Sequence, residues 1–364
     1  YIMSNYGRSP ATPNIGTTSD LAKDATLASP PEDSISSLAW SPVANYLAVG
    51  SWDSKVRIYD VTQSQTGTGV AAIEFDGPVL TCDWSRDGQK VAGAGADKTA
   101  KLLDLGANGA PAQQVAAHDA PIRSARFFDM PNANAPMLAT GSWDKTVRYW
   151  DLRTPAPAAT LACQDRVYSM DVKGQRLVIA TAEKHVHVVN LSNPTTIFKT
   201  SASPLKEQTR VVSCFNDASG YAIGSIEGRC GMQYFEPKDQ NRNFAFRCHR
   251  KALDRNNILE IFSVNAISFH PTYSTCSTAG ADGTFHFWDK DQHNRLKGHT
   301  FVGGPISATA FNHDGTVFTY AVSYDWHKGY AFNSPQHVNK VMLHATTDEE
   351  VKPRAVSTTA NRRR

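Results

Sequence analysis

An eleven-residue unit that recurs along the chain constrains its fold more than any other feature. The unit at 141–151 reads GSWDKTVRYWD, and nearly the same residues stand at 50–60. Each copy joins a short apolar strand to a turn that carries an acid. Aligning the chain on this acid gives seven copies, with the acid at Asp53, Asp97, Asp144, Glu183, Glu227, Asp282 and Asp325. Units repeated every 40 to 45 residues or so indicate a repeat architecture, at about the period of propeller blades.

A second strand precedes each acid, and its pattern repeats as well. An apolar residue begins it in every copy, at Ile35, Val79, Ile122, Val167, Val211, Val264 and Ile306. Two residues later the side chain is small, at Ser37, Thr81, Ser124, Ser169, Ser213, Ala266 and Ala308. Alternation with period two, bounded by Gly, Asn, Asp and Pro turns, is typical of half-buried antiparallel strands. We therefore predict an all-β fold, a seven-bladed β-propeller of WD40 repeats with four antiparallel strands per blade.

The repeat divides the chain into one large domain and two tails. We expect a flexible leader over 1–22, the propeller over 23–351 and a polar, basic tail over 352–364. The stretch at 23–27 is expected to complete the seventh blade, because ring closure removes exposed strand edges. Two insertions depart from the repeat: 236–255 lengthens the fifth blade, and 332–345 extends beyond the last one.

Bulk composition excludes several classes of protein. A hydrophobic fraction of 41% is adequate for a core, and no apolar run approaches the length of about 18 residues that a membrane span needs. The formal net charge of +3 is far from the excess that marks dedicated nucleic-acid binders. The six cysteines are scattered without a C-x-x-C pair. We therefore expect reduced thiols in a soluble, intracellular protein.

Residues that could carry chemistry are sparse. The turn acids recur once per blade, which suits structural hydrogen bonds to backbone N–H groups rather than a single active site. His185 and His187 share one face of a predicted strand, but no third ligand is visible at a supporting spacing, so an exposed pair without metal is favoured. The sequence has no phosphate loop, nucleophile elbow or zinc-protease motif. We expect no enzyme activity, cofactor or metal, and a rigid scaffold that presents its faces to partners.

Several short motifs carry a family resemblance that spans nearly the whole predicted propeller. They include SPLK, GSIEGR, CHR, FWDKD and SYDWHKG, in that order along the chain. Together they resemble the WD-repeat mRNA export factors of the nuclear pore complex. A sister family, the WD-repeat mitotic-checkpoint proteins of kinetochores, shares some of them. The resemblance implies a protein of the nucleus and nuclear envelope that shuttles to the cytoplasm and binds a short hairpin segment of an FG-repeat nucleoporin.

The resemblance also implies a partner groove near the fifth and sixth blades. Carried over position by position, the groove falls on Arg229, Phe246, Trp288, Asp289, Lys290, His293, Arg295 and Lys297. Cations beside aromatic rings suit an acidic peptide with an apolar anchor. From the residues alone, Trp288 is equally well explained as a blade-packing residue like Trp150, and the cations as a solvated loop. His293 replaces a second cation of the family pattern, which weakens the charge at neutral pH or makes it sensitive to pH near about 6.5.

Three other functions stay open. The basic tail suggests binding of single-stranded RNA with weak sequence preference, and the affinity would then fall steeply with salt. The sister family suggests a kinetochore adaptor for mitotic checkpoint proteins. A substrate receptor of a ubiquitin ligase is a common use of propellers, although no segment of this chain specifies it. In each case we expect a monomeric propeller inside a heteromeric complex.

Overall fold

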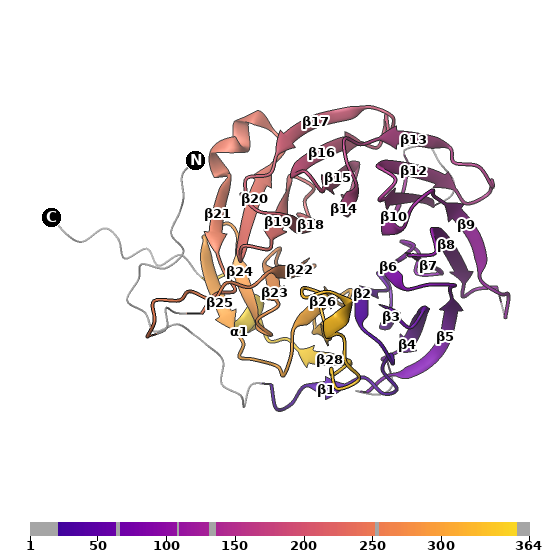
Figure 1. The fold of residues 1–364 in the computed structure, drawn as a ribbon. Coiled ribbons are helices and arrows are strands. Elements are labelled where there is room, and N and C mark those ends of the chain that lie inside the picture. The colour runs from indigo at the N-terminus through magenta and orange to yellow at the C-terminus, as the bar shows by residue number, and fades with distance from the viewer. Residues whose placement is uncertain (1–20, 63–65, 108, 131–135, 252–254, 355–364) are drawn as a thin grey trace.

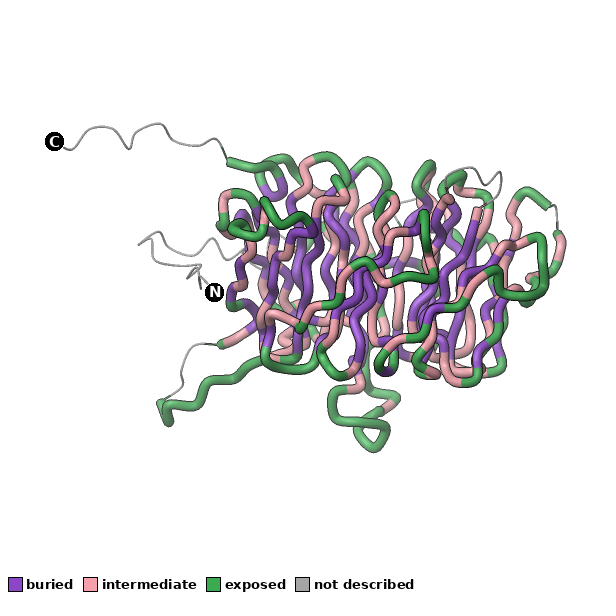
Figure 2. The backbone as a smooth tube through the Cα atoms, turned by 90° about the horizontal axis from the view of Figure 1, so that it is seen from above, coloured by how far each residue is buried: buried purple, intermediate pink, exposed green. Residues whose placement is uncertain are grey.

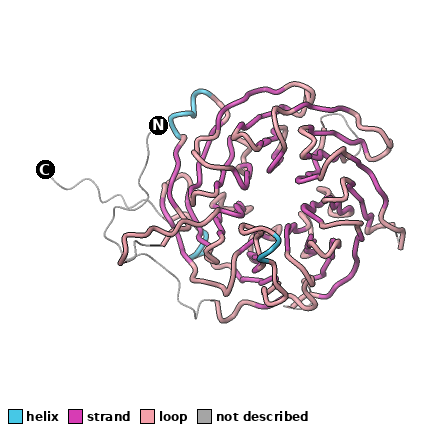
Figure 3. Tube along the Cα trace, in the orientation of Figure 1, coloured by secondary structure: helices cyan, strands magenta, loops and turns pink. Residues whose placement is uncertain are grey.

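The strands form a closed ring of seven four-stranded antiparallel sheets, which confirms the predicted propeller (Figure 1). The computed structural model describes residues 21–62, 66–107, 109–130, 136–251 and 255–354, so most of the expected leader and tail lies outside it. Seen edge-on, buried residues run through the ring and exposed residues gather in its loops (Figure 2). Within the described ranges, helix is confined to η2 (Pro237–Arg242), η3 (Tyr330–Phe332) and α1 (Asp348–Val351) (Figure 3).

Each blade runs from an inner strand beside the central channel to an outer strand at the rim. Blade one comprises β2 (Ile35–Trp40), β3 (Tyr46–Ser51), β4 (Lys55–Asp60) and β5 (Thr68–Glu74). Blade two comprises β6 (Val79–Trp84), β7 (Lys90–Gly95), β8 (Thr99–Asp104) and β9 (Gln113–Ala117). Blade three comprises β10 (Ile122–Phe128), β11 (Met137–Ser142), β12 (Thr146–Asp151) and β13 (Ala159–Ala162). Blades four and five comprise β14 (Val167–Lys173), β15 (Arg176–Thr181), β16 (His185–Asn190) and β17 (Ile197–Ala202); and β18 (Thr209–Cys214), β19 (Gly220–Ser225), β20 (Arg229–Tyr234) and β21 (Phe244–Arg247). Blade six comprises β22 (Val264–Phe269), β23 (Cys276–Gly280), β24 (Phe285–Asp289) and β25 (Asn294–Gly298).

The seventh blade is assembled from both ends of the chain. Its strands are β26 (Ile306–Phe311), β27 (Val317–Val322), β28 (Lys340–Ala345) and, at the rim, β1 (Ala25–Thr26). The prediction that an N-terminal strand closes this blade is confirmed by the pairing of Ala25 with Leu343. The prediction that 332–345 extends beyond the last blade is wrong, because β28 is the third strand of that blade. Likewise, β21 inside the predicted insertion at 236–255 is the regular fourth strand of blade five.

The hydrophobic core lies between neighbouring blades. Seven buried apolar clusters occur in the described residues, and each contains residues of two adjacent blades, including one that joins the first blade to the seventh. Burial of apolar area between sheets is the main source of stability in such a fold. No blade can therefore be removed without exposing two of these interfaces.

Every inner strand carries a β-bulge at the same place. In blade one, Ile35 lies opposite Ser51 whereas Ser37 lies opposite Gly50, so the residue between them is left out of the ladder. The other six inner strands shift register in the same way. In blade five the shift follows Thr209, so this blade's pattern begins two residues earlier than the predicted Val211.

The small side chain after the bulge joins one blade to the next. The hydroxyl of Ser37 accepts a hydrogen bond from the backbone N–H of Cys82 at 3.2 Å, and Ser169 accepts one from Val212 at 3.0 Å. Thr81 accepts the N–H of Ala125 at 3.3 Å. These backbone groups are buried between sheets, where an unpaired N–H would be costly. In these three blades the small residue is thus a hydrogen-bonding joint to the next blade, whereas Ala266 and Ala308 have no hydroxyl at this position.

The turn acids organise the turn between the second and third strands of a blade, at the same end as the bulge. In blade three, His118 Nδ1 lies 2.8 Å from a carboxylate oxygen of Asp144, and its Nε2 lies 2.7 Å from the hydroxyl of Thr140. The indole N–H of Trp150 donates to the same hydroxyl at 2.8 Å. Carboxylates at five other turns accept backbone N–H bonds, namely those of Asp53, Asp97, Glu227, Asp282 and Asp325. Glu183, by contrast, is exposed.

The histidine pair on β16 lies differently from the prediction. His187 is fully buried, and its Nδ1 lies 2.9 Å from the hydroxyl of Thr200. Only His185 is partly exposed, so the expected exposed pair is wrong for one member. Burial lowers the pKa of His187, so this ring is neutral at pH 7.

A glycine before the turn allows the next blade to approach. A Cβ atom built on Gly141 would lie 2.8 Å from Cγ1 of Val167, the first residue of the neighbouring inner strand. We expect Gly141→Ala to lower the free energy of unfolding by about 1–3 kcal/mol through overpacking. Gly69→Ala is the matched control, since its Cβ would meet nothing closer than 4.0 Å. Denaturant unfolding of both variants checks this, and equal midpoints would contradict it.

Candidate partner-binding site at the channel mouth

The groove residues implied by the resemblance lie on blades five and six, but several of them are buried. The side chains of Phe246 and Trp288 are 1% and 4% exposed, and their ring centroids lie 4.6 Å apart in the core between these blades. The indole N–H of Trp288 donates to Thr278, which His249 also contacts, both at 2.9 Å. Trp288 therefore has the same packing role as Trp150. As placed, neither Phe246 nor Trp288 offers an aromatic anchor to a partner.

The acidic residue that ends β24 and the lysine that follows it are also engaged within the chain. Asp289 is buried and accepts the N–H groups of Asp291 and Gln292. Lys290 is 5% exposed, its ammonium lies 2.9 Å from both carboxylate oxygens of Asp291, and it sits over the ring of Phe215 at 5.1 Å. The charges of Asp289 and Lys290, which were predicted to bind a partner, are therefore engaged by contacts within the chain.

Four predicted residues keep part of their surface accessible. Arg229, on β20, contacts the turn acid Glu227 at 3.4 Å, and Arg295 and Lys297 lie half-buried on β25. Burial lowers the pKa of Arg295, whose guanidinium carbon lies 6.0 Å from the ring of Trp288. Burial also lowers the pKa of His293, so this ring is neutral at pH 7. The surface therefore carries three cations near its rim.

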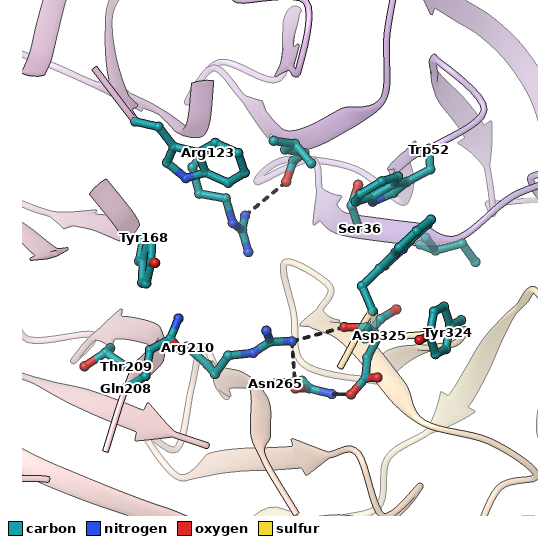
Figure 4. Close-up of a pocket in the computed structure, with 15 residues that line it drawn as sticks. Ser36, Trp52, Arg123, Tyr168, Gln208, Thr209, Arg210, Asn265, Tyr324 and Asp325 are labelled. Atoms are coloured by element: carbon teal, nitrogen blue, oxygen red, sulfur yellow. Dashed lines mark hydrogen bonds between the residues drawn. The ribbon is translucent and has the colours of Figure 1, made fainter. Parts of the chain in front are cut away.

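A second site, which sequence reasoning missed, lies at one mouth of the central channel. A cavity of about 280 Å³ opens there. Its walls include the residue that each of the seven bulges leaves out of the ladder, Ser36, Leu80, Arg123, Tyr168, Arg210, Asn265 and Ser307. A bulge turns its extra residue away from the sheet, and here it turns the side chain toward the channel mouth (Figure 4).

Aromatic residues from the turns surround this cavity. Trp52 and Trp143 immediately precede the turn acids of blades one and three, and Trp326 follows that of blade seven. The rings of Trp52 and Trp326 stack with centroids 3.8 Å apart, and Trp143 is 39% exposed. The indole nitrogen of Trp326 is buried and has no acceptor among the described residues. The cavity thus offers apolar ring surface.

Two arginines place positive charge inside the cavity. Arg123 donates to the carbonyl of Leu80 at 3.2 Å, and Arg210 donates to the side chain of Asn265 at 3.3 Å (Figure 4). In the part of the chain that the structure describes, neither guanidinium forms an ion pair with a carboxylate. Burial lowers the pKa of Arg123 to about 10, and the nearby charge of Arg210 adds to this effect.

One carboxylate lines the same cavity, but it faces other partners. Asp325 accepts from the side-chain amide of Asn265 at 3.0 Å and lies 2.5 Å from Nδ1 of His327. Arg210 reaches only the backbone carbonyl of Asp325, at 3.3 Å. The mouth is therefore a cationic, ring-lined cavity, and its chemistry fits an anionic group attached to an apolar or flat one.

The signal that could have found this site was present in the sequence. Trp52 and Trp143 stand in the two most similar repeat copies, GSWD at 50–53 and 141–144, and their recurrence favours a structural role over a binding role. Arg123 stands between the apolar Ile122 and the small Ser124, at a position whose side chain varies from blade to blade, and the register of blade five places Arg210 at the equivalent position. A position that varies inside a strict repeat is where a repeat protein can encode a binding site.

The closed ring of seven four-stranded blades defines the class of the protein, a WD40 β-propeller. The family model for the WD domain, G-beta repeat, matches residues 25–60, 70–104, 109–151 and 259–289. Within the described residues no helix has the length and apolar character to cross a membrane.

Curated relatives narrow the class further. The chain is 57% identical over 334 residues to the WD40 repeat protein poxJ of Penicillium oxalicum, which covers 92% of this chain and 96% of that protein. It is 55% identical to the mRNA export factor GLE2 of Chaetomium thermophilum, covering 93% and 94%, and 53% identical to the Poly(A)+ RNA export protein of Schizosaccharomyces pombe, covering 97% and 99%. The chain belongs to the family of WD-repeat mRNA export factors.

The packing role of Trp288 can be tested against Trp150. We expect Trp288→Phe and Trp150→Phe to lower the free energy of unfolding by similar amounts, about 1–3 kcal/mol, because each removes a buried hydrogen bond to threonine and some core volume. Thermal unfolding of the two variants provides the measurement. If Trp288→Phe leaves stability unchanged while Trp150→Phe lowers it, Trp288 has a different role from the one assigned here.

Proposed function

We propose that this mRNA export factor is a non-enzymatic scaffold that docks at the nuclear pore by binding a short hairpin segment of an FG-repeat nucleoporin. The domain would be the propeller over 23–351, acting as a monomer within a heteromeric complex in the nucleus and shuttling to the cytoplasm. Relatives named for mRNA and poly(A)+ RNA export support the role in transport. The main support for the docking site is a pair of arginines at the channel mouth, Arg123 and Arg210, which form no ion pair with a carboxylate of the described chain.

The cavity favours an acidic side chain of the inserted segment. A carboxylate between the two guanidinium groups would relieve their mutual repulsion and form charge-assisted hydrogen bonds in a partly desolvated site. An apolar neighbour on the same segment would cover Trp143 and the stacked pair of Trp52 and Trp326, since aromatic surface supplies much of the energy at protein interfaces.

The surface on blades five and six would take the remainder of the segment. Arg229, Arg295 and Lys297 lie at its accessible edge, where cations mainly accelerate association and fix register. The buried members, Phe246, Trp288, Asp289 and Lys290, would shape this surface from below rather than contact the partner. The proposed interface therefore has an anchoring site at the channel and a steering surface at the rim.

Substitutions at the channel mouth separate binding from folding. We expect Arg210→Gln or Arg123→Gln to weaken binding of an acidic nucleoporin segment by at least roughly 30-fold, because a buried charge pair loses a partner at a cost of 2 kcal/mol or more. The melting temperature should stay unchanged or rise, since each change removes one of two neighbouring, half-buried cations. Isothermal titration and thermal unfolding measure the two effects.

The matched control is Arg153→Gln, which changes an exposed arginine that pairs with Asp151 on blade three. It should leave the affinity for the segment unchanged. If the control weakens binding as much as the two channel variants do, general electrostatics rather than the cavity holds the segment, and the proposed anchor is wrong.

Charge reversal tests the rim surface. We expect Arg229→Glu combined with Arg295→Glu to slow association of the segment and to make its rate less sensitive to salt, with a smaller effect on dissociation than the channel variants have. Stopped-flow kinetics at two ionic strengths checks this. Unchanged association rates would remove blades five and six from the interface, whereas an RNA ligand would show an affinity that falls steeply with salt for every variant.

A further inference from the structure

A compact cluster of buried polar side chains lies where the N-terminal strand β1 meets β28 and α1. His344 is on β28, Glu350 is in α1, and His299 directly follows β25 of blade six. Asp24 directly precedes β1. The cluster therefore joins the closing strand of the ring, the last two blades and the C-terminal helix, and it lies outside the channel-mouth cavity.

The distances in this cluster fit the edges of a metal coordination shell. His344 Nε2 lies 3.3 Å from one carboxylate oxygen of Glu350, and His299 Nε2 lies 3.6 Å from the other. One ligand atom from each of the three residues lies within 4.8 Å of the others. Ligands at about 2.0–2.2 Å from a tetrahedral zinc ion are separated from each other by about 3.3–3.6 Å. Only small movements would be needed to place a cation between them.

His299 supplies independent evidence that a ligand belongs here. It is 1% exposed, and neither of its ring nitrogens makes a hydrogen bond within the described residues. The ring is held by stacking on Phe285, with centroids 4.3 Å apart. A buried imidazole without a partner is costly, and a metal ion bound at one ring nitrogen would remove that cost. Burial also lowers the pKa of His299 to about 4, so its nitrogen is available as a neutral ligand.

His344 has the outer partner that is typical of a metal-bound histidine. Its Nδ1 lies 2.7 Å from a carboxylate oxygen of Asp24, whose other oxygen accepts from the hydroxyl of Tyr320 at 2.7 Å. A carboxylate on Nδ1 fixes the tautomer and turns Nε2 toward the metal. In this cluster Nε2 is the nitrogen that faces Glu350. The four residues are therefore arranged as two histidines, one carboxylate ligand and one outer carboxylate.

We propose that His299, His344 and Glu350 bind a divalent transition-metal cation, with Zn²⁺ as the favoured ion, and that Asp24 orients His344. Two imidazoles and a carboxylate are a donor set that zinc accepts, with a water molecule at the fourth position. The cation would tie the N-terminal strand, blade seven and α1 to blade six. Its role would be to hold the ring closed where β1 pairs with β28.

A proton on His344, instead of a metal ion, could balance the negative charges of Asp24 and Glu350. The metal-bound and the protonated arrangements differ at His299. Although burial lowers the pKa of His344, its hydrogen bonds to Asp24 and Glu350 raise it to about 9 overall, so a protonated His344 could bridge the two carboxylates. That arrangement uses Asp24, His344 and Glu350 but gives His299 no hydrogen bond. Loss of a metal on changing His299 alone therefore separates the two.

The test uses the full chain without a histidine tag, stripped of metal by a chelator and dialysed. Zn²⁺ is titrated against a chromophoric chelator, and Co²⁺ is added to a parallel sample for its absorption spectrum. We expect one Zn²⁺ per chain, a rise in melting temperature with Zn²⁺ that a chelator reverses, and the intense visible bands of four-coordinate Co²⁺. Binding of less than a tenth of an equivalent, or binding that gives no Co²⁺ bands, would overturn the proposal.

Variants then assign the ligands. His299→Gln should abolish stoichiometric binding, and Asp24→Asn should weaken it by about 10- to 100-fold, as outer-shell changes do. His313→Gln, at an exposed histidine in the turn between β26 and β27, is the control and should bind like the unchanged chain. Glu350→Gln keeps the size of the side chain, so it tests the carboxylate if His299→Gln proves unstable. Retained Zn²⁺ affinity in both His299→Gln and Glu350→Gln would refute the site.

Discussion

The β-bulge near the start of each inner strand is the local feature on which both the ring and its channel mouth depend. By leaving one residue out of the ladder, it brings the next side chain to the neighbouring blade, where the hydroxyls of Ser37, Thr81 and Ser169 accept backbone N–H groups. The residue left out then faces the channel. One irregularity therefore supplies a lining position for the cavity in all seven blades and, at these three residues, a joint between blades.

The residue after the bulge contacts the next blade, whereas the residue left out of the ladder lines the channel mouth. This difference explains how a protein with a net charge of only +3 can hold a cationic site. In six of the seven blades the residue after the bulge is small, whereas the residue that the bulge leaves out varies and faces the channel mouth. In two of the seven blades this free position is arginine, Arg123 and Arg210, and the scaffold holds both without a carboxylate partner in the described chain. A rigid frame can tolerate such charge repulsion, which a bound acidic group would relieve.

The sequence predicted the architecture well because the repeat expresses it seven times. The seven-bladed ring, four strands per blade and the closing N-terminal strand all follow from periodicity and from the need to remove strand edges. The site was harder to predict. Phe246 and Trp288 look like exposed anchors in a linear motif, yet the packing between blades five and six buries both. The third strand of blade seven was missed because a long connection, which includes η3, separates it from the repeat signal. The cluster of Asp24, His299 and Glu350 draws on three distant segments that only the closed ring brings together.

The central claim is that an acidic residue of a nucleoporin segment pairs with the bulge arginines at the channel mouth. A double-mutant cycle measures this most directly, combining Arg210→Gln with Glu→Gln or Asp→Asn changes at each acid of the segment in turn. One acid should show a coupling energy with Arg210 of about 1.5 kcal/mol or more, the range measured for close charge pairs, and none with the exposed Arg153. Coupling energies near zero for every acid of a segment that still binds would contradict the claim.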